Sequence, residues 1–176
     1  AGTLIPTDKG SFSNTFHYKG ISLGVVLTYS YGNVVRLRKL SNIYTDYGIV
    51  PRELNNRWQF AGDETKTNIP VVYTTFMQNA YGYNEISQAY NTYDYSDIRI
   101  AKGDNIRLKE ISLGYTFDKD FLRETRIRQL SVKLQATNLA LLYADKRLNG
   151  DDPDYLVNGY TPISPKRLIF TLRVGL

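Results

Sequence analysis

Residues 21–31 read Ile-Ser-Leu-Gly-Val-Val-Leu-Thr-Tyr-Ser-Tyr, and this stretch decides the fold class. Its odd positions are all large and apolar or aromatic, whereas its even positions are Ser, Gly, Val, Thr and Ser. Because successive side chains of a β-strand point to opposite faces, this period of two predicts a strand with one continuous apolar face. A helix would instead repeat its apolar residues three or four positions apart.

The same alternation recurs elsewhere in the chain, most regularly in the last residues, where Leu168, Phe170, Leu172 and Val174 share one face. The sequence therefore predicts an all-β, antiparallel chain. The expected strands cover about 11–19, 21–31, 106–117, 127–138 and 166–176.

Two local features predict the register. Lys19-Gly20 is a two-residue link that would set Tyr18 opposite Ile21, and both belong to the apolar face. Ile106 is one residue out of step with Ile111, so we expect a β-bulge near Lys109-Glu110.

A sheet with one apolar face fits two kinds of protein. In a soluble sandwich the apolar face is the core, whereas in an outer-membrane barrel it meets lipid and the polar face meets the lumen. The connections favour the barrel: residues 19–20 and 118–127 are short, whereas residues 32–105 and 139–165 are long. Transmembrane barrels have short periplasmic turns and long extracellular loops. We therefore expect a multi-pass barrel segment whose last strand runs inward to Leu176.

Composition excludes several other classes. The chain has 176 residues, no Cys, one His and a formal net charge of +5 that is spread along the sequence. These values disfavour a disulfide scaffold, a His or Cys metal site, and a nucleic-acid partner. No nucleophile motif, phosphate loop or cofactor motif is present, so we expect neither an enzyme nor a bound cofactor. The unusual number is 15 Tyr.

Several motifs, in order along the chain, resemble one family. Residues 57–65, Arg-Trp-Gln-Phe-Ala-Gly-Asp-Glu-Thr, resemble the Arg-Trp-x-x-Pro-Gly-Asp-x-Thr signature of SusC/RagA-type TonB-dependent transporters, with Ala61 in place of Pro. Residues 105–115 resemble that family's Tyr-Leu-Arg-Leu-Lys-x-Ile-x-Leu-x-Tyr strand, with Asn105 in place of the aromatic residue. Residues 134–139 and the turn at Asp152-Pro153-Asp154 resemble two later motifs of the family.

The resemblance implies about five C-terminal strands of a 22-stranded transmembrane β-barrel in the outer membrane of a Gram-negative bacterium. It further implies import of oligosaccharides or oligopeptides, driven by TonB through an N-terminal region, with a SusD-like surface lipoprotein as partner. The other implied partners are the remainder of the barrel with its plug, lipid or lipopolysaccharide, and a second copy of the complex in a homodimer. The alternative is a soluble β-rich carbohydrate-binding domain with a Tyr-rich surface.

The residues that we expect to contact cargo or the lipoprotein lie in the first long loop: Trp58, Tyr90, Tyr93, Asp94 and Tyr95. Tyr and Trp present an apolar ring and a polar tip, which suits stacking on sugars or peptides. The same aromatic side chains could instead form the small core of the loop. The alternation of Tyr with polar residues over 90–95 favours an exposed contact surface.

Three carboxylates are close together at Asp151, Asp152 and Asp154. Hard oxygen ligands at this spacing could hold calcium. The stretch does not match the twelve-residue calcium loop, and Asp-Pro turns are common. Calcium is therefore only a weak candidate.

Overall fold

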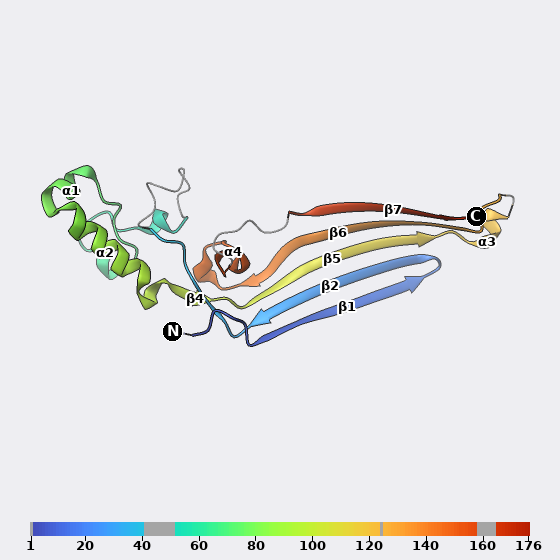
Figure 1. Cartoon of the computed structure of the whole chain (residues 1–176), viewed down its shortest axis with the longest axis horizontal. Helices are drawn as coiled ribbons and strands as arrows, with labels where there is room; N and C mark the ends of the chain where they lie inside the picture. Colours follow the sequence, from blue (N-terminus) through green and yellow to red (C-terminus); the bar gives the residue numbers. More distant parts are fainter. Residues whose placement is uncertain (1, 41–51, 124, 158–164) are drawn as a thin grey trace.

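The chain forms a long single-layer sheet with a small helical subdomain at one end (Figure 1). The computed structural model describes residues 2–40, 52–123, 125–157 and 165–176. The sheet has the order β1-β2-β5-β6-β7, and every neighbouring pair is antiparallel. Its strands are β1 (Asp8–Tyr18), β2 (Ile21–Tyr31), β5 (Asn105–Thr116), β6 (Gln129–Ala144) and β7 (Arg167–Gly175).

The register aligns the apolar positions of all five strands into rows that cross the sheet. One row is Tyr18, Ile21, Tyr115, Val132 and Leu172. The next row is Phe16, Leu23, Leu113, Leu134 and Phe170. One whole face of the sheet is therefore apolar, as the period of two predicts.

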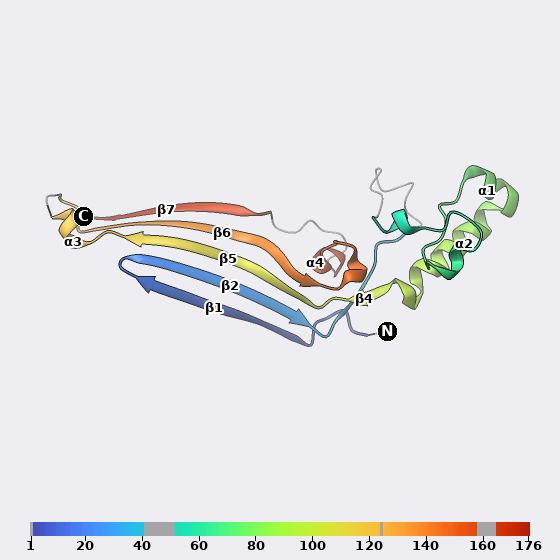
Figure 2. The ribbon, with the colours of Figure 1, turned by 180° about the vertical axis from the view of Figure 1, so that it is seen from behind.

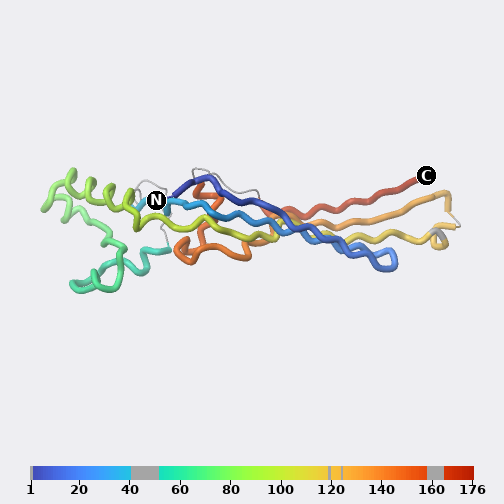
Figure 3. Tube along the Cα trace, turned by 90° about the horizontal axis from the view of Figure 1, so that it is seen from below, coloured from blue at the N-terminus to red at the C-terminus, as the bar shows by residue number. Residues whose placement is uncertain are grey.

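This apolar face is not covered. Phe16 is 61% exposed, Phe170 67% and Leu168 72%. Views from the two sides show no described helix over either face of the strands, and a view from below shows a single thin, twisted layer (Figures 2 and 3). In a folded soluble domain the apolar face of a sheet is buried against another layer. The exposed face therefore argues against the alternative of a soluble carbohydrate-binding domain.

The hairpin between β1 and β2 confirms the predicted register, with Tyr18 opposite Ile21. Its two linking residues both have positive φ, 44° at Lys19 and 79° at Gly20. Such a pair of left-handed residues matches the right-handed twist of the strands. A Cβ atom on Gly20 would lie 2.6 Å from the carbonyl oxygen of Thr116 on the neighbouring strand.

We expect Gly20→Ala to destabilise the sheet by about 1–2 kcal/mol from the left-handed conformation alone, with the backbone contact to Thr116 adding to this. Lys19→Asn should leave stability unchanged or slightly higher, because Asn tolerates the same conformation. The temperature at which the full-length protein loses its heat-modifiable mobility on a gel measures both variants. Equal melting of the two would contradict this role of Gly20.

The predicted β-bulge is present. Val26 is opposite Glu110 whereas Leu27 is opposite Leu108, so Lys109 is left over in the ladder. On the other side of β5 the register also shifts, next to Asn138, which has a φ of 55°. The Lys109 ammonium group donates a hydrogen bond of 2.7 Å to the Asn138 side-chain oxygen, which links β5 and β6 where both strands are irregular.

β6 continues to Ala144, six residues beyond the predicted end at 138. The reason is pairing: Ala144 lies opposite Asn105, so β6 extends for as long as β5 offers a partner above the bulge. β1 likewise begins at Asp8, three residues earlier than predicted, because Asp8 pairs with Tyr31 at the end of β2.

The subdomain at the end of the sheet contains more regular structure than the expected long loops. Its elements are β3 (Val34–Arg36), η1 (Arg52–Asn56), η2 (Asp63–Thr65), α1 (Thr75–Tyr81), α2 (Tyr83–Tyr95), η3 (Asp97–Arg99), β4 (Ile100–Lys102), η4 (Lys146–Leu148) and α4 (Pro153–Val157). At the opposite end, β5 and β6 are joined through α3 (Lys119–Leu122).

The helical hairpin follows from local signals. The Thr74 hydroxyl accepts a hydrogen bond from the Met77 amide, which caps α1. Gly82, with a φ of 89°, joins α1 to α2. Ile86, Tyr90 and Asp94 are spaced by four, and they are the buried face of α2.

The two long connections meet in one small core. β3 pairs with β4, and α4 packs against β3. The buried apolar residues are Val35, Leu37, Ala101, Leu148 and Leu156. The segments around residues 35, 101 and 150 therefore fold together as one unit at this end. No helix in the part of the chain that the structure describes is long and apolar enough to cross a membrane.

Candidate functional site

The face of the sheet opposite the apolar rows is polar and lined by short side chains. Its central rows are built from Ser13, Thr15, Ser22, Gly24, Ser112 and Gly114. Gly24 and Ser112 lie side by side so closely that a Cβ on Gly24 would be 2.6 Å from the Ser112 hydroxyl. Short residues leave open space above this part of the sheet for the longer charged side chains around it.

The charges on this polar face are almost all of one sign. The only carboxylate that the register places there is Glu110, which is 4.0 Å from Lys133. The cations on the polar side of the strands are Lys9, Arg107, Lys109, Lys133, Arg167 and Arg173. We call this set the basic wall.

A recess of about 410 Å³ lies at the subdomain end of the basic wall. Its charged lining groups are Lys9, Arg107, Lys109 and Asp154. Its polar uncharged lining groups are Ser11, Thr28, Ser30 and Asn105. The register explains the arrangement, because Ser11, Thr28 and Arg107 form one row across three strands and Lys9, Ser30 and Asn105 form the next.

The three carboxylates proposed as a weak calcium site are each paired with an arginine. Arg107 donates a hydrogen bond of 2.6 Å to Asp152, makes a second hydrogen bond to that carboxylate, and lies 3.0 Å from Asp154. Arg38 lies 3.6 Å from Asp151. Within residues 2–40, 52–123, 125–157 and 165–176, no group of three acidic or His side chains is arranged to hold a metal ion. The geometry therefore assigns Asp152 and Asp154 to ion pairs between the sheet and the subdomain, and Asp151 to an ion pair within the subdomain.

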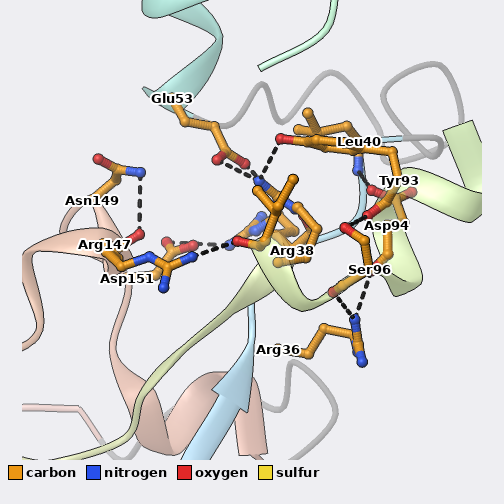
Figure 4. A network of polar contacts seen from close by, with 12 residues as sticks. Arg36, Arg38, Leu40, Glu53, Tyr93, Asp94, Ser96, Arg147, Asn149 and Asp151 are labelled. Atoms are coloured by element: carbon orange, nitrogen blue, oxygen red, sulfur yellow. Dashed lines mark hydrogen bonds and ion pairs between the residues drawn. The ribbon is translucent and has the colours of Figure 1, made fainter. Parts of the chain in front are cut away.

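The subdomain is held together by a buried ion pair between Arg99 and Glu53, and Figure 4 shows the Glu53 carboxylate with its dashed contacts. Two hydrogen bonds of 2.7 Å join them, and their side chains are only 2% and 7% exposed. Arg99 also donates to the Arg38 carbonyl oxygen and to the Tyr93 hydroxyl. Burial alone would lower the pKa of Arg99, but Glu53 outweighs it and the pKa of Arg99 is raised, so the cation is firmly retained.

The Tyr-rich stretch 90–95 was predicted to be an exposed contact surface, and for two of its residues this is wrong. Tyr90 is 8% exposed and packs edge-to-face with Tyr73, with ring centroids 4.9 Å apart. Asp94 is 1% exposed, and its carboxylate accepts a 2.8 Å hydrogen bond from the Leu40 amide. The physical reason is helical periodicity, because residues four apart on α2 share the buried face whatever the alternation suggests.

The other residues of that stretch lie differently. Tyr93 is half-buried against Arg99; burial raises the pKa of its phenol, an effect that Arg99 partly offsets. Tyr95 is largely exposed, and its hydroxyl accepts a 2.7 Å hydrogen bond from Lys39. The Lys39 ammonium group also lies 4.5 Å from the centre of the Tyr95 ring. Of the four predicted residues on α2, Tyr95 is thus the one presented to solvent.

Trp58 lies in a compact turn built from the Arg57–Thr65 motif. Its amide donates to the Ile69 carbonyl oxygen at 3.0 Å, and its side chain is partly exposed. The Asp63 carboxylate accepts from the amides of Phe60 and Gln59, which holds the pKa of that carboxyl below its usual value. The motif therefore orders the turn, and its aromatic rings are left at the surface.

A further surface on α2 was missed by the sequence analysis. Its side chains are uncharged and line a shallow groove of about 460 Å³: Asn84, Ser87, Gln88, Asn91, Thr92 and Tyr95. The signal was present as amides and hydroxyls spaced by three and four. It could be recognised only if the stretch was treated as a helix.

Comparison with known proteins adds an independent line of support. No family model matches the chain. The TonB-dependent receptor P39 of Formosa agariphila is 28% identical over 143 residues, which cover 74% of this chain and 12% of that relative. The chain thus spans about an eighth of the length of the curated relative it matches.

Solved structures of the RagAB peptide importer share the fold. The open-open state has a TM-score of 0.56 and 21% identity, and the closed-closed state has a TM-score of 0.55 and 21% identity. Each match covers 87% of this chain and 15% of the other chain. The five strands are thus arranged as in part of the RagAB importer structure.

The ordered motifs, the curated relative and the shared fold agree with one another, and no feature of the described residues conflicts with them. Together they support the resemblance of this chain to part of a SusC/RagA-type TonB-dependent transporter.

Proposed function

We propose that this chain is the C-terminal portion of an outer-membrane importer, near the end of a 22-stranded barrel. The importer would take up oligosaccharides or oligopeptides with a SusD-like lipoprotein, driven by TonB. The observation that carries the proposal is the exposed apolar face, whose rows are in register across all five strands. A lipid-facing barrel wall is the structure that needs such a face.

The length of the apolar band supports a membrane role. Aromatic rows mark its two ends, with Tyr18 and Tyr115 at one and Tyr29 and Tyr143 at the other. Tyr18 lies opposite Ile21 at the turn, and Tyr29 lies eight residues further along β2, which corresponds to about 27 Å. The apolar band of outer-membrane barrels is about 25 Å tall and is bordered by aromatic girdles.

The open edges of the sheet support a larger barrel. Among the described residues, β1 and β7 each pair on one side only. Unpaired backbone groups in lipid cost several kcal/mol each, so we propose that further strands of the same transporter complete both edges. The subdomain would then lie outside the cell and the short turns in the periplasm.

The likeness to the RagAB peptide importer supports a partner protein. We propose that a SusD-like lipoprotein covers the subdomain end of this transporter. Trp58, Tyr95 and the uncharged groove of α2 are the candidate contacts with this partner or with cargo, because all of them reach the surface.

The test uses the full-length protein in its own host. We expect the protein to fractionate with the outer membrane, and a strain lacking it to lose growth on at least one oligosaccharide or oligopeptide that supports the parent strain. Deleting TonB should abolish the same growth. Recovery of the protein in the periplasmic or aqueous fraction would overturn the proposal, as would growth that does not depend on TonB.

A further inference from the structure

We infer that the basic wall selects anionic cargo: oligomers that carry carboxylate, sulfate or phosphate groups, with a binding subsite in the recess at Lys9 and Lys109. This inference rests on the proposed import function, and it assigns a charge class to what passes along the polar face.

The first argument is the separation of charge within the chain. The whole chain has 22 Lys and Arg against 17 Asp and Glu, which is close to balance. The polar face of the five strands has six cations and the single carboxylate Glu110. Since acidic residues are common elsewhere in the chain, the excess of cations over carboxylates is specific to this face.

The second argument is that most of these cations are not used within the described chain. Lys133 is near Glu110, and Arg107 is held by Asp152 and Asp154. The other four cations of the wall make no ion pair among residues 2–40, 52–123, 125–157 and 165–176: Lys9, Lys109, Arg167 and Arg173. Lys109 donates a hydrogen bond to the neutral side chain of Asn138, so no carboxylate among these residues neutralises any of the four charges.

The third argument is the recess. Lys9 and Lys109 line the same space of about 410 Å³, whose size is within the range of small-ligand sites. The hydroxyls of Ser11, Thr28 and Ser30 lie between them and can donate to an oxyanion. Asp154 also lines the recess, but its carboxylate lies 3.0 Å from Arg107, so the two lysines give the recess its excess positive charge.

A wall of like charge also acts over distance. Charges of one sign on a low-dielectric surface focus the field and raise the local concentration of the opposite charge. The strands put Lys9 near the subdomain end, Arg167 in the middle of the sheet and Arg173 near the other end, so the positive potential runs along the whole polar face. An anionic oligomer would therefore be attracted at entry and held in the recess.

The experiment measures binding to the purified full-length transporter by calorimetry. The anionic probes are tetragalacturonate, a sulfated galactose tetramer, tripolyphosphate and tetraglutamate, and the neutral counterparts are a galactose tetramer and tetraglutamine. We expect at least one anionic probe to bind more tightly than its neutral counterpart. The double variant Lys9→Gln/Lys109→Gln should weaken that binding about tenfold and leave neutral probes unaffected.

The matched control is Lys66→Gln, which removes an exposed cation of the subdomain that lies outside the basic wall. Equal binding of charged and neutral probes would overturn the inference. It would also be overturned if the double variant lowers the melting temperature while the preference for anions stays, because the lysines would then neutralise another part of the transporter. TonB-dependent growth together with equal binding of anionic and neutral probes would still support import and would contradict only the preference for anionic cargo.

Discussion

Val25→Arg should block stable assembly of the full-length protein in the outer membrane, whereas Val26→Arg should be tolerated. Val25 lies in the middle row of the apolar face, between Asn14 and Ile111. An arginine on the lipid face of a barrel costs about 2–4 kcal/mol at the bilayer midplane. Val26 lies on the polar face directly opposite Glu110, where an arginine gains a carboxylate neighbour.

The pair is closely matched, since the two positions are adjacent, begin as the same residue and receive the same substitution. The measurement is the amount of heat-modifiable protein in the outer-membrane fraction and its melting temperature. Equal loss in both variants would mean that the apolar face does not meet lipid. Equal tolerance of both substitutions would also mean that the apolar face does not meet lipid.

Arg99→Met should unfold the subdomain while leaving the sheet intact. The substitution leaves the Glu53 carboxylate buried without its partner, and breaking a buried ion pair from one side costs about 3–5 kcal/mol. It also removes the hydrogen bond to the Arg38 carbonyl oxygen, which joins η3 to the segment after β3. We expect faster amide exchange and protease cleavage over residues 75–102, with protection of β2 and β5 unchanged.

Two further variants calibrate this result. Arg99→Lys keeps the charge but cannot form both hydrogen bonds to Glu53 in the same geometry, so its effect should be intermediate. Lys66→Gln breaks the exposed pair with Asp63 and should cost at most about 1 kcal/mol. If Arg99→Met exchanged no faster than Lys66→Gln, the buried pair would not be what stabilises the subdomain.

The strands of the sheet could be predicted from the sequence because the pattern within each strand specifies which side chains share a face. The alternation of residues 21–31 gives the face of every side chain, and the Lys19-Gly20 turn sets the pairing of Tyr18 with Ile21. Even the bulge at Lys109 could be predicted, since it is a change of phase within one strand. These are properties of neighbouring residues, and they do not depend on the remainder of the fold.

The subdomain was not predictable to the same degree. Tyr90 and Asp94 have polar groups in their side chains. Both are nevertheless buried, because one face of α2 packs against residues that lie far away in the sequence. The Glu53–Arg99 pair joins residues 46 positions apart, and no local pattern signals such a contact. The Asp152–Arg107 pair likewise joins a turn to a strand 45 positions away, so a cluster of carboxylates that resembled a metal site became a set of ion pairs.

Local sequence patterns thus gave the class of sheet, the two faces of each strand and, through the ordered motifs, the resemblance to a family. The folded chain was needed to show which tyrosines are exposed, which arginines pair with the carboxylates, and that cations from four strands share one face, three of them at a recess. The physical reason is the distance along the chain over which each interaction acts. Strand periodicity is set by covalent geometry between adjacent residues, whereas burial and charge pairing are set by segments that meet only when the chain is folded.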